Sequence, residues 1–325
     1  MGLLDGLAKG LGSAVAAGYA TSWAAAHLSL PPLASGGLTA AASASALVYY
    51  ARVWIQGYYF DAHYIPTADL SARVAVVTGG TVGGLGFAAA ELLAQMGATT
   101  IVTCRSEAKG KAAVAALKQS AGHDRVSYVL CDFMSCASCN AAAREILKAA
   151  PQIDMLILNA GIASGPGGDD AAVWMTNHLG PFLFTECLSP ALTAAAARPD
   201  GDVRVVAVSS GAHKGASINW EDPFSPTGKG AFAGAYGQSK LANIMHMREL
   251  QRRLPSTDEE GRKRIRCLAV TPGAAWTAIM PSPPLPLRPL MWAVMRTPTV
   301  GAQVIKMACL DTQLQGGECK TVMLS

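Results

Sequence analysis

From residue 72 onward, short runs of β-branched residues alternate with Ala-rich stretches of helical length. The runs predicted to be strands are residues 73–78, 99–104, 125–131, 153–158, 202–208, 264–270 and 320–324. The stretches predicted to be helices are residues 86–96, 109–120, 135–149, 171–197, 235–254 and 299–310. Because strands that alternate with helices form βαβ units, their strands run parallel in one sheet. We therefore predict a doubly wound α/β domain of about seven strands over residues 71–325.

Residues 1–70 follow a different pattern and are predicted to form an apolar helical extension. No Asp, Glu, Lys or Arg occurs between Lys9 and Arg52, and prolines and glycines at 31–37 divide this run into two predicted helices, 10–30 and 37–59. Each approaches the ~20 residues that a membrane-spanning helix needs, although Ala and Ser make both only weakly hydrophobic. Glycine, alanine or serine also recurs at every fourth position from 2 to 22, which permits close helix packing. The alternatives are a membrane-embedded segment, a segment packed on a protein partner, and a cleaved or disordered one.

The amino-acid composition indicates which kinds of molecule the protein is expected to bind. Charged residues make up 15% of the chain and apolar ones 51%, whereas soluble domains have about 25% charged residues, so part of the surface is expected to meet lipid or protein. A formal charge of +4 is too weak to drive nucleic-acid binding through phosphate neutralisation, and no nucleic-acid partner is predicted. We expect a membrane-associated protein, with the organelle (mitochondrion, chloroplast or endoplasmic reticulum) left open.

The eight cysteines are predicted to be reduced thiols, because most lie within apolar runs of a long chain. Cys131, Cys136 and Cys139 have a spacing that superficially resembles a metal-ligand set. No fourth ligand lies nearby, however, and Cys136 and Cys139 stand at i and i+3 of a predicted helix, where both would face the core. No metal site is therefore predicted.

Residues 73–86 read RVAVVTGGTVGGLG, which is a buried strand, a glycine-rich turn and the start of a helix. Glycines let the backbone approach a pyrophosphate closely, and a helix that begins near Leu85 would direct unpaired N–H groups towards its charge. This segment predicts a nucleotide phosphate site.

The second predicted strand is followed by Arg105, with no Asp or Glu placed to bind a ribose 2′-hydroxyl. An arginine at this place would instead neutralise a 2′-phosphate, which favours NADP(H) over NAD(H); the alternative is a solvated surface arginine. Asp132, after the third strand, would either bind the adenine region or cap the next helix.

Tyr236 and Lys240 lie four residues apart at the start of a predicted helix and therefore project from one face. A phenol has an ordinary pKa near ~10, which makes it a poor acid–base group at neutral pH. A neighbouring ammonium favours the phenolate, so Lys240 is expected to lower the pKa of Tyr236 towards the working range.

Nine segments occur in one order along residues 72–325. They are TGGTVGGLG at 78–86, VTCRS at 102–106, CDFMSCAS at 131–138, LNAG at 158–161, NHLGPFLFT at 177–185, VSSGAH at 208–213, AYGQSKLAN at 235–243, TPGAAWT at 271–277 and RTPTVGAQ at 296–303. Together they closely resemble the short-chain dehydrogenase/reductase family, particularly its retinol-dehydrogenase-like branch. The resemblance implies a Rossmann-like fold with the dinucleotide and substrate sites in the same domain.

The resemblance also implies a role for individual positions. Tyr236 would be the general acid in reduction or the base in oxidation, Lys240 would bind the nicotinamide ribose, and Ser210 would hydrogen-bond the substrate oxygen. Asn177 would hold a water in a proton relay, or act only as a hydrogen-bonding group of its helix. The predicted cofactor-binding residues are Thr78, Gly79, Gly84, Gly86, Arg105, Asp132, Asn159, Gly161, Lys240, Pro272, Gly273 and Thr277.

The chain departs from the family pattern in two places. The glycine-rich turn has one residue more than the usual T-G-x-x-x-G-x-G, so it must bulge or shift, and Leu158 replaces the first Asn of the usual N-N-A-G. Residues 214–234 resemble an insertion of the retinol-dehydrogenase-like branch and are expected to flank the pocket. Residues 280–295, rich in Pro, Leu, Met and Trp, stand where the family folds its lid, which favours a lipophilic ligand or, alternatively, packing on a membrane or neighbour.

These observations predict an NADP(H)-dependent oxidoreductase that transfers a hydride between nicotinamide and a lipophilic alcohol or carbonyl compound, of retinoid, steroid or lipid type. The rival interpretation is a catalytically idle subunit of a membrane protein complex that retains the fold, with nucleotide binding either kept or lost. Residues 1–70 would contact a membrane or a membrane-protein partner under either interpretation, and self-association into a homo-oligomer stays open.

Overall fold

A computed structural model describes residues 67–226, 234–254, 264–275 and 295–321, together with 40, 42–50, 52, 277, 279, 285, 288, 291 and 292. Residues 42–50 are helical, within the predicted helix 37–59. Most of the predicted extension lies outside the described residues, and so do the predictions about its partner. Within the described part of the chain, no helix combines the length and the apolar character needed to cross a membrane.

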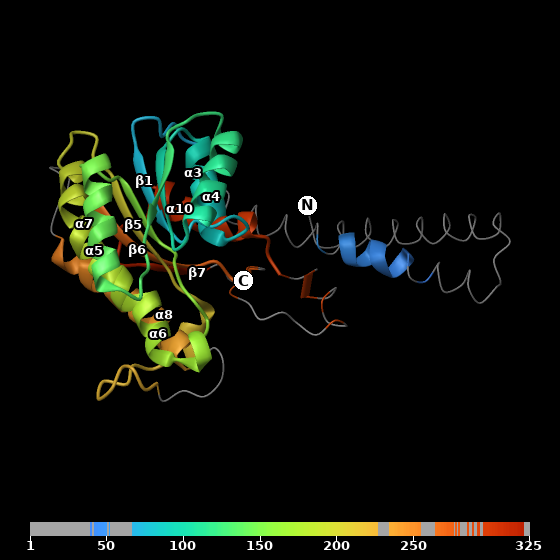
Figure 1. The fold of residues 1–325 in the computed structure, drawn as a ribbon. Helices are drawn as coiled ribbons and strands as arrows, with labels where there is room; N and C mark the ends of the chain where they lie inside the picture. Colours follow the sequence, from blue (N-terminus) through green and yellow to red (C-terminus); the bar gives the residue numbers. More distant parts are fainter. Residues whose placement is uncertain are drawn as a thin grey trace.

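The core of the fold is one sheet of seven parallel strands in the order β3-β2-β1-β4-β5-β6-β7, which confirms the predicted doubly wound α/β fold (Figure 1). The strands are β1 (Val74–Thr78), β2 (Thr99–Cys104), β3 (Val126–Leu130), β4 (Met155–Leu158), β5 (Val203–Val208), β6 (Ile265–Thr271) and β7 (Cys319–Thr321). The strands β4, β5 and β6 are buried along their whole length. They are apolar at nearly every position because helices cover both faces of the sheet.

The helices form two layers. Those named here are α3 (Leu85–Gln95), α4 (Glu107–Ala121), α5 (Cys136–Ala149), α6 (Asp170–Trp174), α7 (Gly180–Ala196), α8 (Ala235–Arg253) and α10 (Pro298–Leu310). Side chains of α3, α4 and α10 pack into one apolar cluster and those of α5, α7 and α8 into another, on opposite faces of the sheet (Figure 1).

The predicted helix 171–197 contains a turn of a different kind. Between α6 and α7, residues Met175–Leu179 form one turn of π-helix, in which the Gly180 N–H bonds to the Met175 oxygen five residues earlier. Pro181 follows directly and has no N–H to continue the regular pattern. The periodicity of apolar residues does not reveal one extra residue in a helical turn, so the π-helical turn was not predicted from the sequence. Its consequence is the orientation of Asn177, which lies within the π-helical turn.

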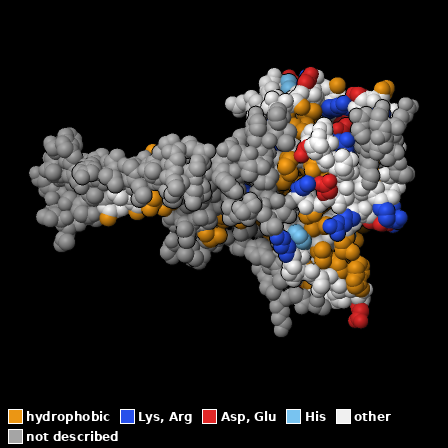
Figure 2. Space-filling view, turned by 180° about the vertical axis from the view of Figure 1, so that it is seen from behind, with side chains coloured by type: hydrophobic (Ala, Val, Ile, Leu, Met, Phe, Trp, Pro, Cys, Tyr) orange, Lys and Arg blue, Asp and Glu red, His pale blue; other side chains and the backbone are white. Residues whose placement is uncertain are grey.

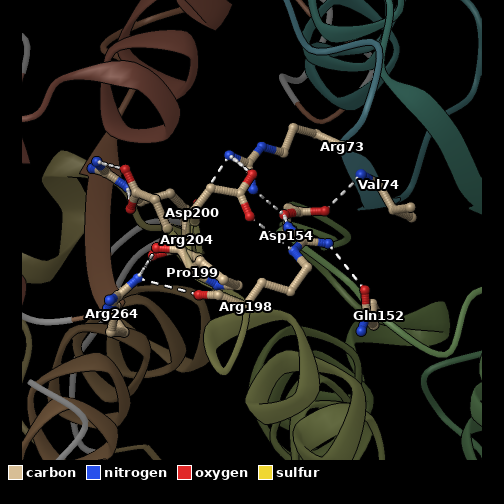
Figure 3. Close-up of polar contacts among 11 residues, drawn as sticks. Arg73, Val74, Gln152, Asp154, Arg198, Pro199, Asp200, Arg204 and Arg264 are labelled. Carbon is tan, nitrogen blue, oxygen red and sulfur yellow. Dashed lines mark hydrogen bonds and ion pairs between the residues drawn. The ribbon is translucent and has the colours of Figure 1, made fainter. Parts of the chain in front are cut away.

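Arginines and aspartates are concentrated at the amino ends of the strands, where the figure shows Asp154 between two arginines (Figure 3). The Asp154 carboxylate is 1% exposed and accepts hydrogen bonds from Arg73 (3.0 Å), Arg198 and the Val74 N–H (2.9 Å). Arg204, also 1% exposed, pairs with Asp202. These contacts tie the starts of neighbouring strands together on the edge of the sheet opposite to the carboxyl ends.

Replacement of Asp154 by asparagine is expected to lower the free energy of unfolding by about 2–3 kcal/mol, because it leaves buried donors without a charged acceptor. Urea denaturation of both proteins measures this difference. Asp200→Asn is the matched control, since Asp200 pairs with the same arginines but is 65% exposed. An exposed pair contributes only about 0–1 kcal/mol. Equal losses in the two variants would contradict the prediction.

The surface seen from behind carries charges of both signs. Lys and Arg side chains lie among Asp and Glu in this view, and an apolar patch occupies the lower part of the domain (Figure 2). Over the described residues as a whole, on whichever face, the large apolar side chains with more than a third of their surface exposed include Phe182, Trp220, Phe224 and Met245. This face therefore presents apolar surface between charges rather than one continuous basic surface.

Candidate active site

The glycine-rich turn follows β1 and absorbs its additional residue as a β-turn. The Gly84 N–H bonds to the Thr81 oxygen at 3.0 Å, and Gly83 between them has a φ of 78°. A positive φ at the third position of such a turn favours glycine. Helix α3 then begins at Leu85, where the sequence predicted it. The extra residue is thus accommodated before the helix without displacing its start.

Thr78 and Asn159 join the ends of β1 and β4 beneath this turn. The Thr78 hydroxyl accepts hydrogen bonds from the N–H groups of Asn159 (2.8 Å) and Ala160 (2.9 Å), while the Asn159 amide donates to the Thr78 oxygen (2.9 Å). Gly86 packs against this amide so closely that a Cβ there would lie 2.3 Å from Asn159 Nδ2. Three of the predicted cofactor residues therefore hold the turn in its shape.

The start of α3 suits an anionic group. Its N-cap residue, Gly84, provides no side-chain cap, and its first turn contains no acidic residue. The first N–H groups of a helix carry a partial positive charge and attract phosphates. The residues at this position therefore fit the pyrophosphate of a dinucleotide.

The ends of β2 and β3 lie beside the turn. The Thr103 oxygen accepts the N–H groups of Gly79 and Gly80, both at 3.1 Å, and fixes the turn against β2. Arg105 follows β2 on this edge with its side chain exposed. Asp132 accepts the Met134 N–H at 3.1 Å, so it forms a local turn after β3.

The structure rules out one of the two alternatives for Asp132 and corrects the prediction for Cys136. Ser135, and not Asp132, caps α5, since its hydroxyl accepts the Ser138 N–H at 3.2 Å. Cys139 is buried as predicted, but Cys136 is exposed. The reason is that Cys136 is the first residue of α5, where the helix has only begun to approach the sheet.

Tyr236, Lys240 and Ser210 are brought together at the carboxyl ends of the strands. The Tyr236 phenol is hydrogen-bonded to Ser210, and Lys240 Nζ lies 5.5 Å from the centre of the Tyr236 ring. Lys240 is 3% exposed and donates to the Val208 oxygen at 2.9 Å. The i and i+4 spacing at the start of α8 thus places both groups on one face, beside the end of β5.

Burial is the largest influence on the pKa values of Tyr236 and Lys240. It raises the pKa of Tyr236, against a smaller lowering by the hydrogen bond from Ser210, and it lowers the pKa of Lys240 to about 8. The expectation that Lys240 lowers the pKa of Tyr236 is therefore wrong for the protein alone. The physical reason is that desolvation disfavours the charged form of both groups.

Asn177 connects the loop after β4 to α8. Its amide accepts the Ile162 N–H at 2.7 Å and donates to the Ile162 oxygen at 2.9 Å and to the Ser239 hydroxyl at 3.1 Å. A Cβ on Gly161 would lie 3.1 Å from Asn177 Oδ1 and 3.4 Å from Lys240 Nζ. Glycine at position 161 therefore lets the amide and the ammonium approach the same point.

Sequence reasoning gave no role to two residues of the AYGQSK segment. The Ser239 hydroxyl accepts a hydrogen bond from the Asn177 amide and donates one to the main-chain carbonyl oxygen of Tyr236 at 2.8 Å. Gln238 accepts the Asn219 N–H at 2.9 Å and donates to the Pro223 oxygen at 2.6 Å. Gln238 thus ties the predicted insertion to α8. Polar residues on a helix that is otherwise predicted to be buried are the signal that could have found both.

The segment after β6 supplies the other predicted cofactor residues. Gly273 has a φ of 74°, Pro272 is buried, and the Thr277 side chain is partly buried. Their contacts with a cofactor stay predictions. Tyr236 belongs to an apolar cluster with Val173 and Ala235, and Ile162, Ala163, Ala212 and Ile279 pack against this cluster. The arrangement places Tyr236, Ser210 and Lys240 at the same edge of the sheet as a glycine-rich turn whose residues fit a pyrophosphate, which is the organisation of a dinucleotide-dependent oxidoreductase.

Comparison with known proteins agrees with this class. The sequence profile of short chain dehydrogenases matches residues 73–283. The human dehydrogenase/reductase SDR family member 13 is 37% identical over 72% of this chain and 61% of its own length. Mouse retinol dehydrogenase 14 is 34% identical over 77% of this chain and 79% of its own. A short-chain dehydrogenase from Escherichia coli CFT073, solved with NADPH, has the same fold, with a TM-score of 0.61 and 22% identity over 80% of this chain and 100% of the other.

The chain therefore belongs to the short-chain dehydrogenase/reductase family of oxidoreductases, in its retinol-dehydrogenase-like branch. The fold of this family implies a nicotinamide cofactor. The match spans about three-fifths of the length of the human relative.

Proposed function

We propose that the protein is an NADP(H)-dependent oxidoreductase that interconverts a lipophilic alcohol and its carbonyl compound. The observation that carries the proposal is that Ser210 and the buried Tyr236 and Lys240 lie together, with Tyr236 inside an apolar cluster. The uncapped start of α3 lies at the same edge of the sheet and suits a dinucleotide.

Each side chain has a part in the reduction. The Tyr236 hydroxyl donates its proton to the substrate oxygen, and Ser210 hydrogen-bonds the same oxygen. Burial raises the pKa of Tyr236, so the phenol keeps its proton at neutral pH but is by itself a weaker acid, whereas the hydrogen bond from Ser210 lowers this pKa. Lys240 contributes a positive charge near the phenol, and Asn177 fixes the loop after β4 against α8. A bound nicotinamide supplies or accepts the hydride.

The lipophilic substrate class rests on the side chains around the phenol. The partly buried side chains of Ile162, Ala163, Ala212 and Ile279 pack against the apolar cluster that contains Tyr236. Burial of apolar substrate surface against such a wall contributes about 25 cal/mol per Å². Retinol, the substrate in the name of the mouse relative, is an alcohol of this kind.

Arg105 is proposed to select the phosphorylated cofactor. Its exposed guanidinium follows β2 beside the turn, where it would pair with a ribose 2′-phosphate. We expect Arg105→Ala to raise KM for NADPH by about 10- to 100-fold, the loss of one charge-assisted contact, while KM for NADH changes little.

Steady-state kinetics with both cofactors measure this change. Lys111→Ala is the control, because Lys111 is an exposed cation on α4 that pairs with Glu107 and should leave both KM values unchanged. An equal rise of KM for NADH and NADPH would contradict the assignment.

The proposed function is tested with the full chain, NADPH and a panel of retinoid, steroid and long-chain aldehyde or ketone substrates. We expect NADPH oxidation with at least one of them and none with a small polar ketone. Binding of NADPH without turnover of any compound, together with purification in a large assembly, would support the rival structural role. We also propose that residues 1–70 contact a membrane, which flotation of the chain with liposomes tests.

A further inference from the structure

Arg296 opens the RTPTVGAQ segment, and no function described above uses it. It is 4% exposed and lies directly under the segment that follows β6. Its Nη1 donates to the Pro272 oxygen at 2.7 Å, and its main-chain N–H donates to the Ala274 oxygen at 2.9 Å. Arg296 also pairs with Ala275 as an isolated parallel bridge. One residue therefore holds the segment by both its side chain and its backbone.

Gly273 shows how closely the guanidinium fits. A Cβ at this position would lie 2.4 Å from Arg296 Nη1 and 2.5 Å from Cζ, far inside van der Waals contact. The φ of 74° also disfavours any other residue. The guanidinium thus fills the space that a side chain at 273 would occupy, and the turn is shaped around it.

The residues that follow Arg296 form the start of α10, which packs against the start of α3. Thr297 caps α10 by accepting the Val300 N–H at 3.2 Å. One turn into the helix, a Cβ on Gly301 would lie 3.2 Å from Leu85 Cδ1 and 3.4 Å from Ala275 Cβ. Leu85 is the first residue of α3. The start of α10 therefore packs between the segment after β6 and the helix that is proposed to face the pyrophosphate.

We propose that Arg296 is a positioning residue for the dinucleotide. It fixes the 272–275 segment, which contains the predicted cofactor-binding residues Pro272 and Gly273, in one conformation beside the start of α3. The inference rests on the proposed function and adds a residue to it. A guanidinium suits this role because its planar, fixed set of donors holds a carbonyl in one geometry, whereas the flexible ammonium of lysine does not.

The test measures NADPH binding by isothermal titration calorimetry and thermal unfolding without cofactor, for the full chain and its variants. Arg296→Lys is expected to raise Kd for NADPH about tenfold, because the segment loses a charge-assisted hydrogen bond that shapes it. Gly273→Ala should raise Kd similarly by displacing the guanidinium. The double variant should be no worse than the poorer single variant, since both changes disrupt one contact.

Arg204→Lys is the matched control. Arg204 is another buried arginine, and it contacts the opposite end of α10 by donating to the Ala308 (3.2 Å) and Asp311 (2.9 Å) oxygens. It should lower the unfolding temperature and leave Kd within about twofold of that of the unmodified chain, since it lies at the amino ends of the strands.

An unchanged Kd in Arg296→Lys, or in Gly273→Ala if the first variant does not fold, would overturn the inference and leave the proposed function intact. Additive losses in the double variant would also overturn it. Failure of the unmodified chain to bind either NADPH or NADH would instead overturn the proposed function and this inference with it.

Discussion

Tyr236→Phe is expected to lower kcat by about 10²- to 10⁴-fold, the usual contribution of a positioned general acid. The phenol is the acid of the proposed mechanism because it is hydrogen-bonded to Ser210 and lies within the apolar cluster. Phenylalanine keeps the ring and its packing and removes only the hydroxyl. Kd for NADPH should therefore stay within about twofold of its original value, since the phenol contributes a proton and not a phosphate contact.

Single-turnover measurements with saturating NADPH separate this chemical step from binding. Tyr128→Phe is the control, because Tyr128 lies in β3 and packs against Gly110 of α4, away from the proposed site. Retention of more than about a tenth of the activity in Tyr236→Phe would exclude the phenol as the proton donor, given the size of general acid catalysis.

Lys240→Met is expected to abolish most activity and to stabilise the fold. Loss of a buried positive group that acts on the reacting centre lowers kcat by about 10²- to 10³-fold. Burial lowers the pKa of Lys240 to about 8 from an ordinary value of 10.5, so below pH 8 the folded protein bears a cost of about 3 kcal/mol for holding the charge. The lost hydrogen bond to Val208 offsets about 1 kcal/mol of the gain.

The expected difference in stability between Lys240→Met and the unmodified chain depends on pH. Because the folded protein binds this proton less tightly than the unfolded chain does, the cost is complete below pH 8 and disappears as the pH rises to about 10.5. Chemical denaturation at pH 7 should show Lys240→Met more stable by about 1–2 kcal/mol, and the difference should shrink at pH 9.5.

Lys111→Met serves as the control, since its ammonium is exposed and paired with Glu107. A Lys240→Met protein less stable than the original at pH 7 would contradict the prediction. It would mean that the contact with the Val208 oxygen outweighs the desolvation of the ammonium.

Particular residues show which parts of the site could be read from the sequence. The positions of Tyr236 and Lys240 on one face of a helix follow from their spacing alone, and so does the start of α3 after a glycine-rich turn. The gathering of Thr78, Asn159 and Ser210 at one edge follows from the parallel order of their strands, because the carboxyl ends of parallel strands lie together. These features depend only on residue spacing within one element or on the order of the strands, and both can be predicted from the sequence.

Other features depend on contacts between distant parts of the chain. The packing of Arg296 against Gly273 and the direction of the Tyr236 pKa shift both arise from burial or close approach of residues far apart in the sequence. A sequence pattern does not report how far a group is removed from water, and desolvation is what reversed the expected pKa shift.

The sequence by itself determined the doubly wound sheet, the family, and which residue types stand at the ends of the strands, because periodicity and spacing act within single elements. Only the tertiary structure decided which of those residues touch, how deeply each is buried and which charge states are favoured. Electrostatic free energies depend on surroundings that many separate segments create together, and those surroundings exist only in the folded protein.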